Sequence, residues 1–349
     1  MNAQWQTFLQ QNGASLEDGV VSHFDDVGIE FQNIELSTIL VDLSHRGLLK
    51  ASGEDAEGFL QGQFCNDVRA VDIGHSQLSA YCTPKGRILT SFRLYQSDDA
   101  YFMSMQRDVI DATLKRLRMF VLRSKVTLDD VSNEFVQLGI SGPEASRLLE
   151  AELGSVPDAI NAVVCKGHLV CVRIAGPTSR FEVYGPESEM RPLWQTLSAV
   201  ACPVASHYWT WLDIRAGIPA ITAPVVEAFV PQMINLHWID GLSFKKGCYP
   251  GQEIVARTHY LGKLKRRMYL AHVNTPACPA VGDDVHRLAE PQGQSAGKIL
   301  LSHPSPQGGC DVLVVMQIDA VAVDDIIANR DVQMKLQFGE LPYSVAGAA

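Results

Sequence analysis

Helix-like and strand-like patterns alternate twice along the first 200 residues. One candidate helix begins in SGEDAEGFLQGQF (52–64), and a second begins in SGPEASRLLEAEL (141–153). Each is followed by strand-like runs, and then by a longer segment with apolar residues at helical spacing, 107–122 in the first case and 187–200 in the second. The shared order predicts two related α+β units built on antiparallel hairpins.

The pattern changes after about residue 265. Short apolar runs there alternate with Pro- and Gly-rich turns at close spacing, which is typical of a small β-barrel or sandwich. We therefore predict an α+β protein with three domains. They are an N-terminal α+β domain (1–130), a second α+β domain that carries the motif KGCYPGQE (131–262), and a C-terminal β-barrel (263–349).

Composition limits the functions to consider. The 349 residues carry a formal charge of -10, which disfavours extended nucleic-acid binding, so any RNA contact would have to be local. No apolar run reaches membrane-spanning length, and the first residues do not have the pattern of a signal peptide. The eight cysteines lack the spacing of a metal site. We expect a monomeric cytoplasmic protein in which most cysteines are buried free thiols.

The stretch KKGCYPGQE (245–253) carries the most specific chemical signal. Cys248 lies close after Lys245 and Lys246 in the sequence and just before an expected helix, and both the ammonium groups and the helix dipole favour a thiolate. Cys248 is therefore the candidate nucleophile or soft-metal ligand. The alternative is a buried thiol in a tight turn, which we prefer for the other seven cysteines.

The helix after this cysteine is expected to begin at Pro250 and to stop at Gly262. The apolar residues expected to pack one side of it are Ile254, Val255, Thr258 and Leu261. Basic residues gather towards and beyond its end: Arg257, Lys263, Lys265, Arg266 and Arg267. They form either a solvated edge or an anion site for carboxylates or phosphates.

Two tryptophans mark another expected helix, which ends near Gly217. Trp209 and Trp211 are two residues apart, so they cannot point the same way on a helix. One of them can therefore face a cleft and stack on a planar ring.

The run 229–266, with its K-G-C-Y-x-G-Q-E pattern, resembles the signature region of the YgfZ family of folate-binding proteins, within the superfamily of the glycine-cleavage T-protein, an aminomethyltransferase. The similarity extends to SGEDAEGFLQGQ and PKGR near the N-terminus. It implies three domains arranged as a ring around a central channel that holds tetrahydrofolate or a derivative. It also implies a role in the maturation or repair of iron–sulfur enzymes, including those that thiolate tRNA. The implied partners are folate and these client enzymes.

The resemblance also implies a site. The chemistry, and a possible transient iron–sulfur interaction, would belong to Cys248. The implied folate-binding residues are Arg46, Trp209, Asp213, Arg215, Tyr249, Gln252 and Arg257. Where T-proteins have a pterin-binding glutamate this chain has Arg215, and the resemblance implies that Asp213 partly replaces that glutamate.

Two other functions stay open. The first is a tetrahydrofolate-dependent one-carbon (aminomethyl) transferase, but T-proteins carry an acidic pair where this chain has Thr90 and Ser91. That departure argues against aminomethyl transfer. The second is an RNA- or protein-binding module that uses residues 257–267 without folate.

Overall fold

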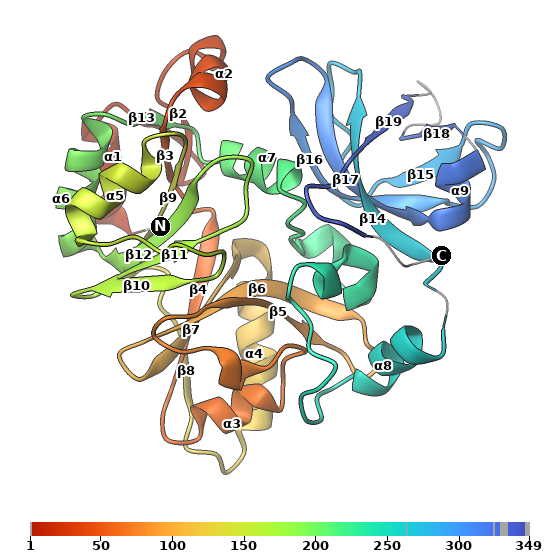
Figure 1. Cartoon of the computed structure of the whole chain (residues 1–349), viewed down its shortest axis with the longest axis horizontal. Coiled ribbons are helices and arrows are strands. Elements are labelled where there is room, and N and C mark those ends of the chain that lie inside the picture. The colour runs from red at the N-terminus through yellow and green to blue at the C-terminus, as the bar shows by residue number, and fades with distance from the viewer. Residues whose placement is uncertain (1, 263, 324, 329–333, 346–349) are drawn as a thin grey trace. The chain divides into compact units, whose positions relative to one another are not determined.

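The structure is a computed structural model that describes residues 2–262, 264–323, 325–328 and 334–345. Its elements are labelled in Figure 1. The chain divides into two compact units, each built from separate segments. Unit 1 comprises Met1–Phe59, Val68–Gln77 and Arg93–Trp209, and unit 2 comprises Leu60–Asp67, Leu78–Phe92 and Thr210–Ala349. The domain limits 1–130, 131–262 and 263–349 stay a prediction.

The two predicted α+β repeats are present, which confirms the α+β class. The first repeat consists of β4 (Arg46–Ser52), α3 (Ala56–Gln61), β5 (Gln77–Cys82), β6 (Ile88–Ser97), β7 (Ala100–Gln106) and α4 (Ile110–Val121). The second consists of β9 (Phe135–Ser141), α5 (Ala145–Leu153), β10 (Val163–Lys166), β11 (Leu169–Arg173), β12 (Arg180–Pro186) and α6 (Glu187–Ser198). Strand order is β5-β6-β7-β4 in one sheet and β10-β11-β12-β9 in the other, so the sequence repeat is a structural repeat.

A glycine with positive φ connects the first strand and the first helix of each repeat. Gly53 has φ 114° and Gly142 has φ 132°, a conformation that other residues rarely adopt. A Cβ on Gly53 would lie 2.1 Å from the Lys125 carbonyl oxygen, and one on Gly142 would lie 2.5 Å from the Cα of Thr38. The Ser-Gly dipeptide therefore marks both repeats, because the backbone turns there so close to other main-chain atoms that a side chain does not fit.

The remaining elements of unit 1 flank these repeats. They are α1 (Ala3–Gln11), β1 (Ser15–Glu17), β2 (Val20–His23), α2 (Val27–Leu36), β3 (Ile39–Asp42), η1 (Val68–Ala70), η2 (Arg107–Val109), β8 (Thr127–Asp130) and β13 (Cys202–Val204). Strand β3 pairs with β9 and with β13, and β8 pairs with β4. Helices α1, α5 and α6 pack on the second sheet (Figure 1), and α1 buries Trp5, Phe8 and Leu9 there as its apolar spacing indicates.

Unit 2 holds the predicted barrel. Its strands, with a short helix, are β14 (Arg266–Val273), β15 (Asp284–Arg287), β16 (Gly297–Pro304), β17 (Cys310–Gln317), α9 (Ile318–Val323), β18 (Ile326–Ile327) and β19 (Leu336–Gly339). The sheet order is β18-β15-β16-β17-β14-β19, all antiparallel, and a bridge between Ile327 and Lys335 nearly closes it. The C-terminal barrel is therefore confirmed.

Helices and turns connect the repeats to the barrel. They are α7 (Tyr208–Arg215), η3 (Ala223–Val225), η4 (Pro231–Ile234), η5 (Leu236–Trp238) and α8 (Gln252–Tyr260). Among the described residues, no helix is long and apolar enough to cross a membrane.

Candidate functional site

Lys246 is the buried anchor of the KKGCYPGQE loop. Its ammonium group donates hydrogen bonds to the main-chain oxygens of Gln61 (2.7 Å), Phe64 (2.5 Å) and Asn66 (3.0 Å), and the residue is only 7% exposed. The ammonium also lies 5.2 Å from the ring centroid of Tyr249. A buried ammonium needs partners of this kind. Lys246 therefore fixes the loop to the segment after α3.

Gly251 provides a second anchor. It has φ 88° and lies immediately before α8. A Cβ at this position would lie 2.5 Å from the carbonyl oxygen of Thr83 and 2.6 Å from the Cα of Gly86, in the turn of the PKGR segment. The predicted start of the helix at Pro250 is wrong by two residues, because Gly251 is left-handed and α8 begins at Gln252.

Between these anchors the loop presents a thiol. Cys248 is exposed, whereas Tyr249 next to it is buried. The side-chain amide of Gln252 lies 3.4 Å from the main-chain oxygens of Lys246 and Gly247, on either side of the turn that leads to Cys248. The sequence motif thus consists mainly of residues that hold the backbone and present the Cys248 thiol.

The predicted packing of α8 is mostly wrong. Val255 is buried, but Ile254 is 39% exposed and Leu261 is 85% exposed. Thr258 is half-buried and its hydroxyl donates to the Ile254 carbonyl within the helix. The reason is that α8 contacts the rest of the unit through Gly251 and through the hydrogen bond from the Gln232 amide to the Val255 carbonyl (2.6 Å). The side of the helix that carries Val255 therefore faces the core, and the sides that carry Ile254 and Leu261 do not.

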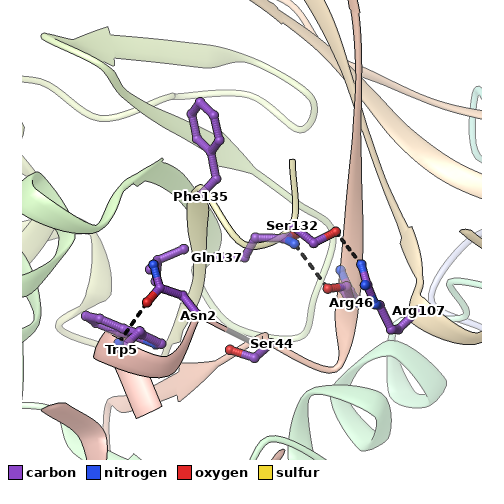
Figure 2. Close-up of a pocket in the computed structure, with 9 residues that line it drawn as sticks. Asn2, Trp5, Ser44, Arg46, Arg107, Ser132, Phe135 and Gln137 are labelled. Atoms are coloured by element: carbon purple, nitrogen blue, oxygen red, sulfur yellow. Dashed lines mark hydrogen bonds between the residues drawn. The ribbon is translucent and has the colours of Figure 1, made fainter. Parts of the chain in front are cut away.

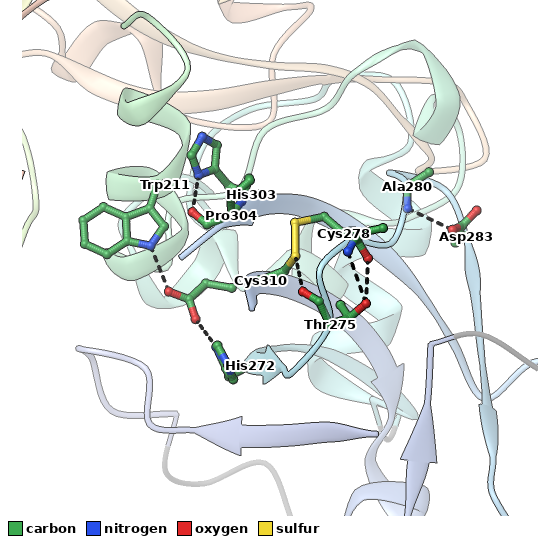
Figure 3. Close-up of a disulfide and its surroundings, with 11 residues drawn as sticks. Trp211, His272, Thr275, Cys278, Ala280, Asp283, His303, Pro304 and Cys310 are labelled. Atoms are coloured by element: carbon green, nitrogen blue, oxygen red, sulfur yellow. Dashed lines mark hydrogen bonds and ion pairs between the residues drawn. A yellow bond between two sulfur atoms is a disulfide. The ribbon is translucent and has the colours of Figure 1, made fainter. Parts of the chain in front are cut away.

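The expectation of buried free thiols is wrong for three cysteines. Cys278 and Cys310 form a disulfide (Figure 3), and Cys165 is exposed. The spacing of 32 residues between the disulfide partners carried no signal in the sequence. Pairing of β14 with β17 places Val273 opposite Cys310, which brings the loop after β14 to the start of β17. Cys65, Cys82 and Cys171 are buried free thiols, as expected, and Cys202 is a half-buried free thiol.

The two tryptophans of α7 have different partners, as their spacing predicts. The Trp209 ring is fully buried, with the Arg180 guanidinium 4.1 Å from a ring centroid. Trp211 is partly exposed and donates to Asp311 (2.8 Å), whose other oxygen lies 2.9 Å from His272 Nδ1 (Figure 3). Both indoles are thus held by protein groups.

Glu182 is a site residue that the sequence analysis missed. Its buried carboxylate accepts hydrogen bonds from Arg46 (2.5 Å), Trp209 (3.0 Å) and Tyr184 (2.5 Å), and Arg93 lies 3.6 Å away. Burial raises the pKa of Glu182, but the charges of Arg46 and Arg93 and the hydrogen bonds outweigh it and hold the pKa at about 2. An acidic residue inside the apolar strand run RFEVYG was the available signal.

Arg46 also lines a small cavity in unit 1 (Figure 2). The cavity is lined by Asn2, Trp5, Ser44, Arg46, Arg107, Ser132, Phe135, Val136 and Gln137. Its volume of about 10 Å³ is that of a single water site, so it cannot hold a pterin ring. Arg107 within it is engaged by Ser132 (2.6 Å) and Asp130 (2.9 Å).

The other predicted residues are dispersed. Asp213 is buried, Arg215 and Arg257 are exposed, and Lys263 lies outside the described residues. The structure therefore brings Cys248, Tyr249 and Gln252 together in one loop, and Arg46 together with Trp209 around Glu182.

Thr90 and Ser91, at the position of the T-protein acidic pair, are buried. The Ser91 hydroxyl accepts from the Ile221 main-chain N–H (3.1 Å). Within the described part of the chain, no three His, Cys, Asp or Glu side chains are placed to hold a metal ion.

Known proteins share this architecture. Residues 3–207 match the family described as the GCVT N-terminal domain. The glycine cleavage system aminomethyltransferase T from Bartonella henselae superposes with a TM-score of 0.79 over 98% of this chain and 97% of that one, at 17% identity, which shows a shared fold. The chain is thus a protein of the GCVT class.

Curated relatives define the family more closely. The tRNA-modifying protein YgfZ of Colwellia psychrerythraea is 33% identical over 304 residues, which cover 84% of this chain and 92% of the relative. The YgfZ protein of Serratia proteamaculans is 31% identical over 311 residues, with 89% and 94% coverage. The chain belongs to the YgfZ family.

Proposed function

We propose that this protein binds a reduced folate and acts through Cys248 in support of iron–sulfur enzymes, including enzymes that thiolate tRNA. The observation that carries the proposal is the exposed Cys248 thiol on a loop anchored by Lys246 and Gly251. A thiolate held in one place can act as a nucleophile or ligate iron. Relatives at 31–33% identity are named tRNA-modifying proteins, which makes tRNA modification the pathway to test.

We assign folate binding, by direct contact or by positioning a contacting residue, to the residues that the family resemblance implies: Arg46, Trp209, Asp213, Arg215, Tyr249, Gln252 and Arg257. Arg215 and Arg257 are exposed, and a guanidinium pairs well with a glutamate-tail carboxylate. Because Trp209 is fully buried, it would act by holding Glu182, which in turn positions Arg46. The T-protein-like fold supports this choice of ligand.

Aminomethyl transfer is the weaker candidate. Strand β6 has no carboxylate between Ile88 and Ser97, and the hydroxyls of Thr90 and Ser91 are buried and bonded to main-chain groups. No acid there can assist the folate nitrogen. Purified protein should therefore give no turnover in a reconstituted glycine-cleavage assay.

Calorimetric titration with 5-formyltetrahydrofolate tests the folate assignment. Wild type should release heat at micromolar ligand, and Trp209→Ala should bind more weakly because Arg46 loses its orientation. Absence of heat from folded wild-type protein at high micromolar ligand rules out the folate assignment.

The role of Cys248 needs a cellular readout. In a strain that lacks the endogenous protein, Cys248→Ser should lower the level of thiolated tRNA, whereas the matched variant of the other exposed thiol, Cys165→Ser, should restore it. Full restoration by Cys248→Ser, at equal protein level, contradicts the proposal.

A further inference from the structure

Three aromatic side chains cluster at the end of α8, where His259 and Tyr260 are exposed and Phe244 is half-buried. The His259 ring stacks on Phe244, with centroids 3.8 Å apart and planes at 15°. Tyr260 lies 4.8 Å from His259 and 6.1 Å from Phe244. Tyr260 is 65% exposed, and the next residue, Leu261, is 85% exposed. Rings of this size are usually buried, and an exposed group of them marks a binding surface.

The charged residues near this cluster in the sequence are mostly basic. Residues 244–267 contain seven lysines and arginines and one acid, Glu253, in a chain whose formal charge is -10. Lys245, Arg257 and Lys265 are exposed among them. None of these three forms an ion pair within the described residues that would neutralise it. The surface thus combines ring faces with surplus positive charge.

Alternation of aromatic rings with cations is the pattern by which proteins bind unpaired nucleic acid. Base–aromatic stacking accepts any base, while lysines and arginines contact the phosphates. A double helix keeps its bases stacked inside and cannot use the ring faces. An acidic partner without unpaired bases would contact the lysines and arginines but would not stack on the aromatic rings.

We propose that the surface formed by Phe244, Lys245, Arg257, His259, Tyr260 and Lys265, here called the α8 surface, binds an unpaired stretch of RNA. This inference rests on the proposed function, since the relatives' names make tRNA the RNA to consider. It is a local contact, which agrees with the overall negative charge. The loop with Cys248 leads directly into α8, so RNA bound to the α8 surface lies next to the segment that carries the exposed thiol.

Fluorescence anisotropy with a labelled tRNA anticodon stem–loop measures the contact, with an RNA duplex of equal length for comparison. Wild type should prefer the stem–loop. Tyr260→Ala should weaken its binding by about 10-fold, within the range of single base–ring stacking, while Tyr260→Phe keeps the ring and stays within about 2-fold of wild type. Phe120→Ala, an exposed ring of α4 in unit 1, is the matched control and should change nothing.

The cations are tested by salt dependence. Lys265→Ala should lower the slope of log affinity against log salt by about 0.7, the value for one phosphate contact on a single strand. The control is Lys335→Ala, which removes an exposed lysine paired with Asp325 in the same unit and should leave the slope unchanged.

Several results overturn the inference. They are equal affinity for duplex and stem–loop, no loss with Tyr260→Ala in a protein of unchanged melting temperature, or equally tight binding of poly-glutamate or anionic vesicles. The 5-formyltetrahydrofolate titration on the same preparations separates the two proposals. Intact folate binding without RNA binding refutes the α8 surface alone, whereas ring-dependent RNA binding without folate binding supports it and refutes the folate assignment.

Discussion

Replacing Lys246 by methionine removes the ammonium that holds three main-chain oxygens while keeping an apolar side chain of similar length. The oxygens belong to Gln61, Phe64 and Asn66. A hydrogen bond from a charged donor contributes about 1.5–3 kcal/mol, and each oxygen left buried without a partner costs about 1–3 kcal/mol. Water can reach some of the vacated space, so we expect a net loss of about 3 kcal/mol in the free energy of unfolding.

Urea denaturation followed by circular dichroism measures this loss. The matched control is Lys245→Met, one residue away on the exposed side of the loop, where a surface substitution should stay within about 0.5 kcal/mol. Equal stability of the two variants would show that the Lys246 contacts do not hold the loop, and the reasoning about its anchoring would be refuted.

Three further predictions concern unit 1. Glu182→Gln leaves half-buried Arg46 and buried Arg93 without their carboxylate and should cost about 3–5 kcal/mol by urea denaturation, whereas Glu189→Gln, partly exposed, should cost under about 1 kcal/mol. The pKa of Glu182 is about 2 in the folded protein, against an ordinary value of 4.5. Its contribution to the free energy of unfolding is therefore fully present above pH 4.5 and is lost as the pH falls towards 2. Unfolding free energies measured across this acid range should show a loss of roughly 3 kcal/mol from Glu182 in wild type and no such loss in Glu182→Gln. Gly139→Ala places a Cβ 2.6 Å from the Trp209 ring, so the melting temperature should fall by an amount equivalent to about 1–3 kcal/mol and Trp fluorescence should shift; an unchanged spectrum contradicts the packing.

The parts that were predictable from sequence are those set by local chemistry. The Ser-Gly dipeptide marks both repeats because the backbone at Gly53 and Gly142 needs positive φ, which is written in two adjacent residues. The barrel was visible because its strands are short and separated by turn residues. Cys248 could be singled out because the lysines and the expected helix that mark it are close to it in the sequence.

The parts that were missed depend on contacts between distant residues. Lys246 was expected to act on the thiol, but its partners are 180 to 185 positions away, and no periodicity in the sequence indicates them. Glu182 is acceptable inside a strand because Arg46 and Trp209 meet it there. The spacing of apolar residues in α8 predicted a packed face, but spacing alone does not show whether another element covers that face. Leu261 is in fact exposed.

The central claim is that Cys248 is a reactive, accessible thiol. Iodoacetamide labelling of the folded protein across pH, read by mass spectrometry, compares it with Cys165, the other exposed cysteine. Partial burial, with the charge of Asp98, raises the pKa of Cys165 above its ordinary value, so that thiol should label more slowly at neutral pH. We predict that Cys248 labels first among the six free cysteines, because its side chain is exposed on an anchored loop. Labelling of Cys248 only after denaturation, or later than Cys165, would contradict the account.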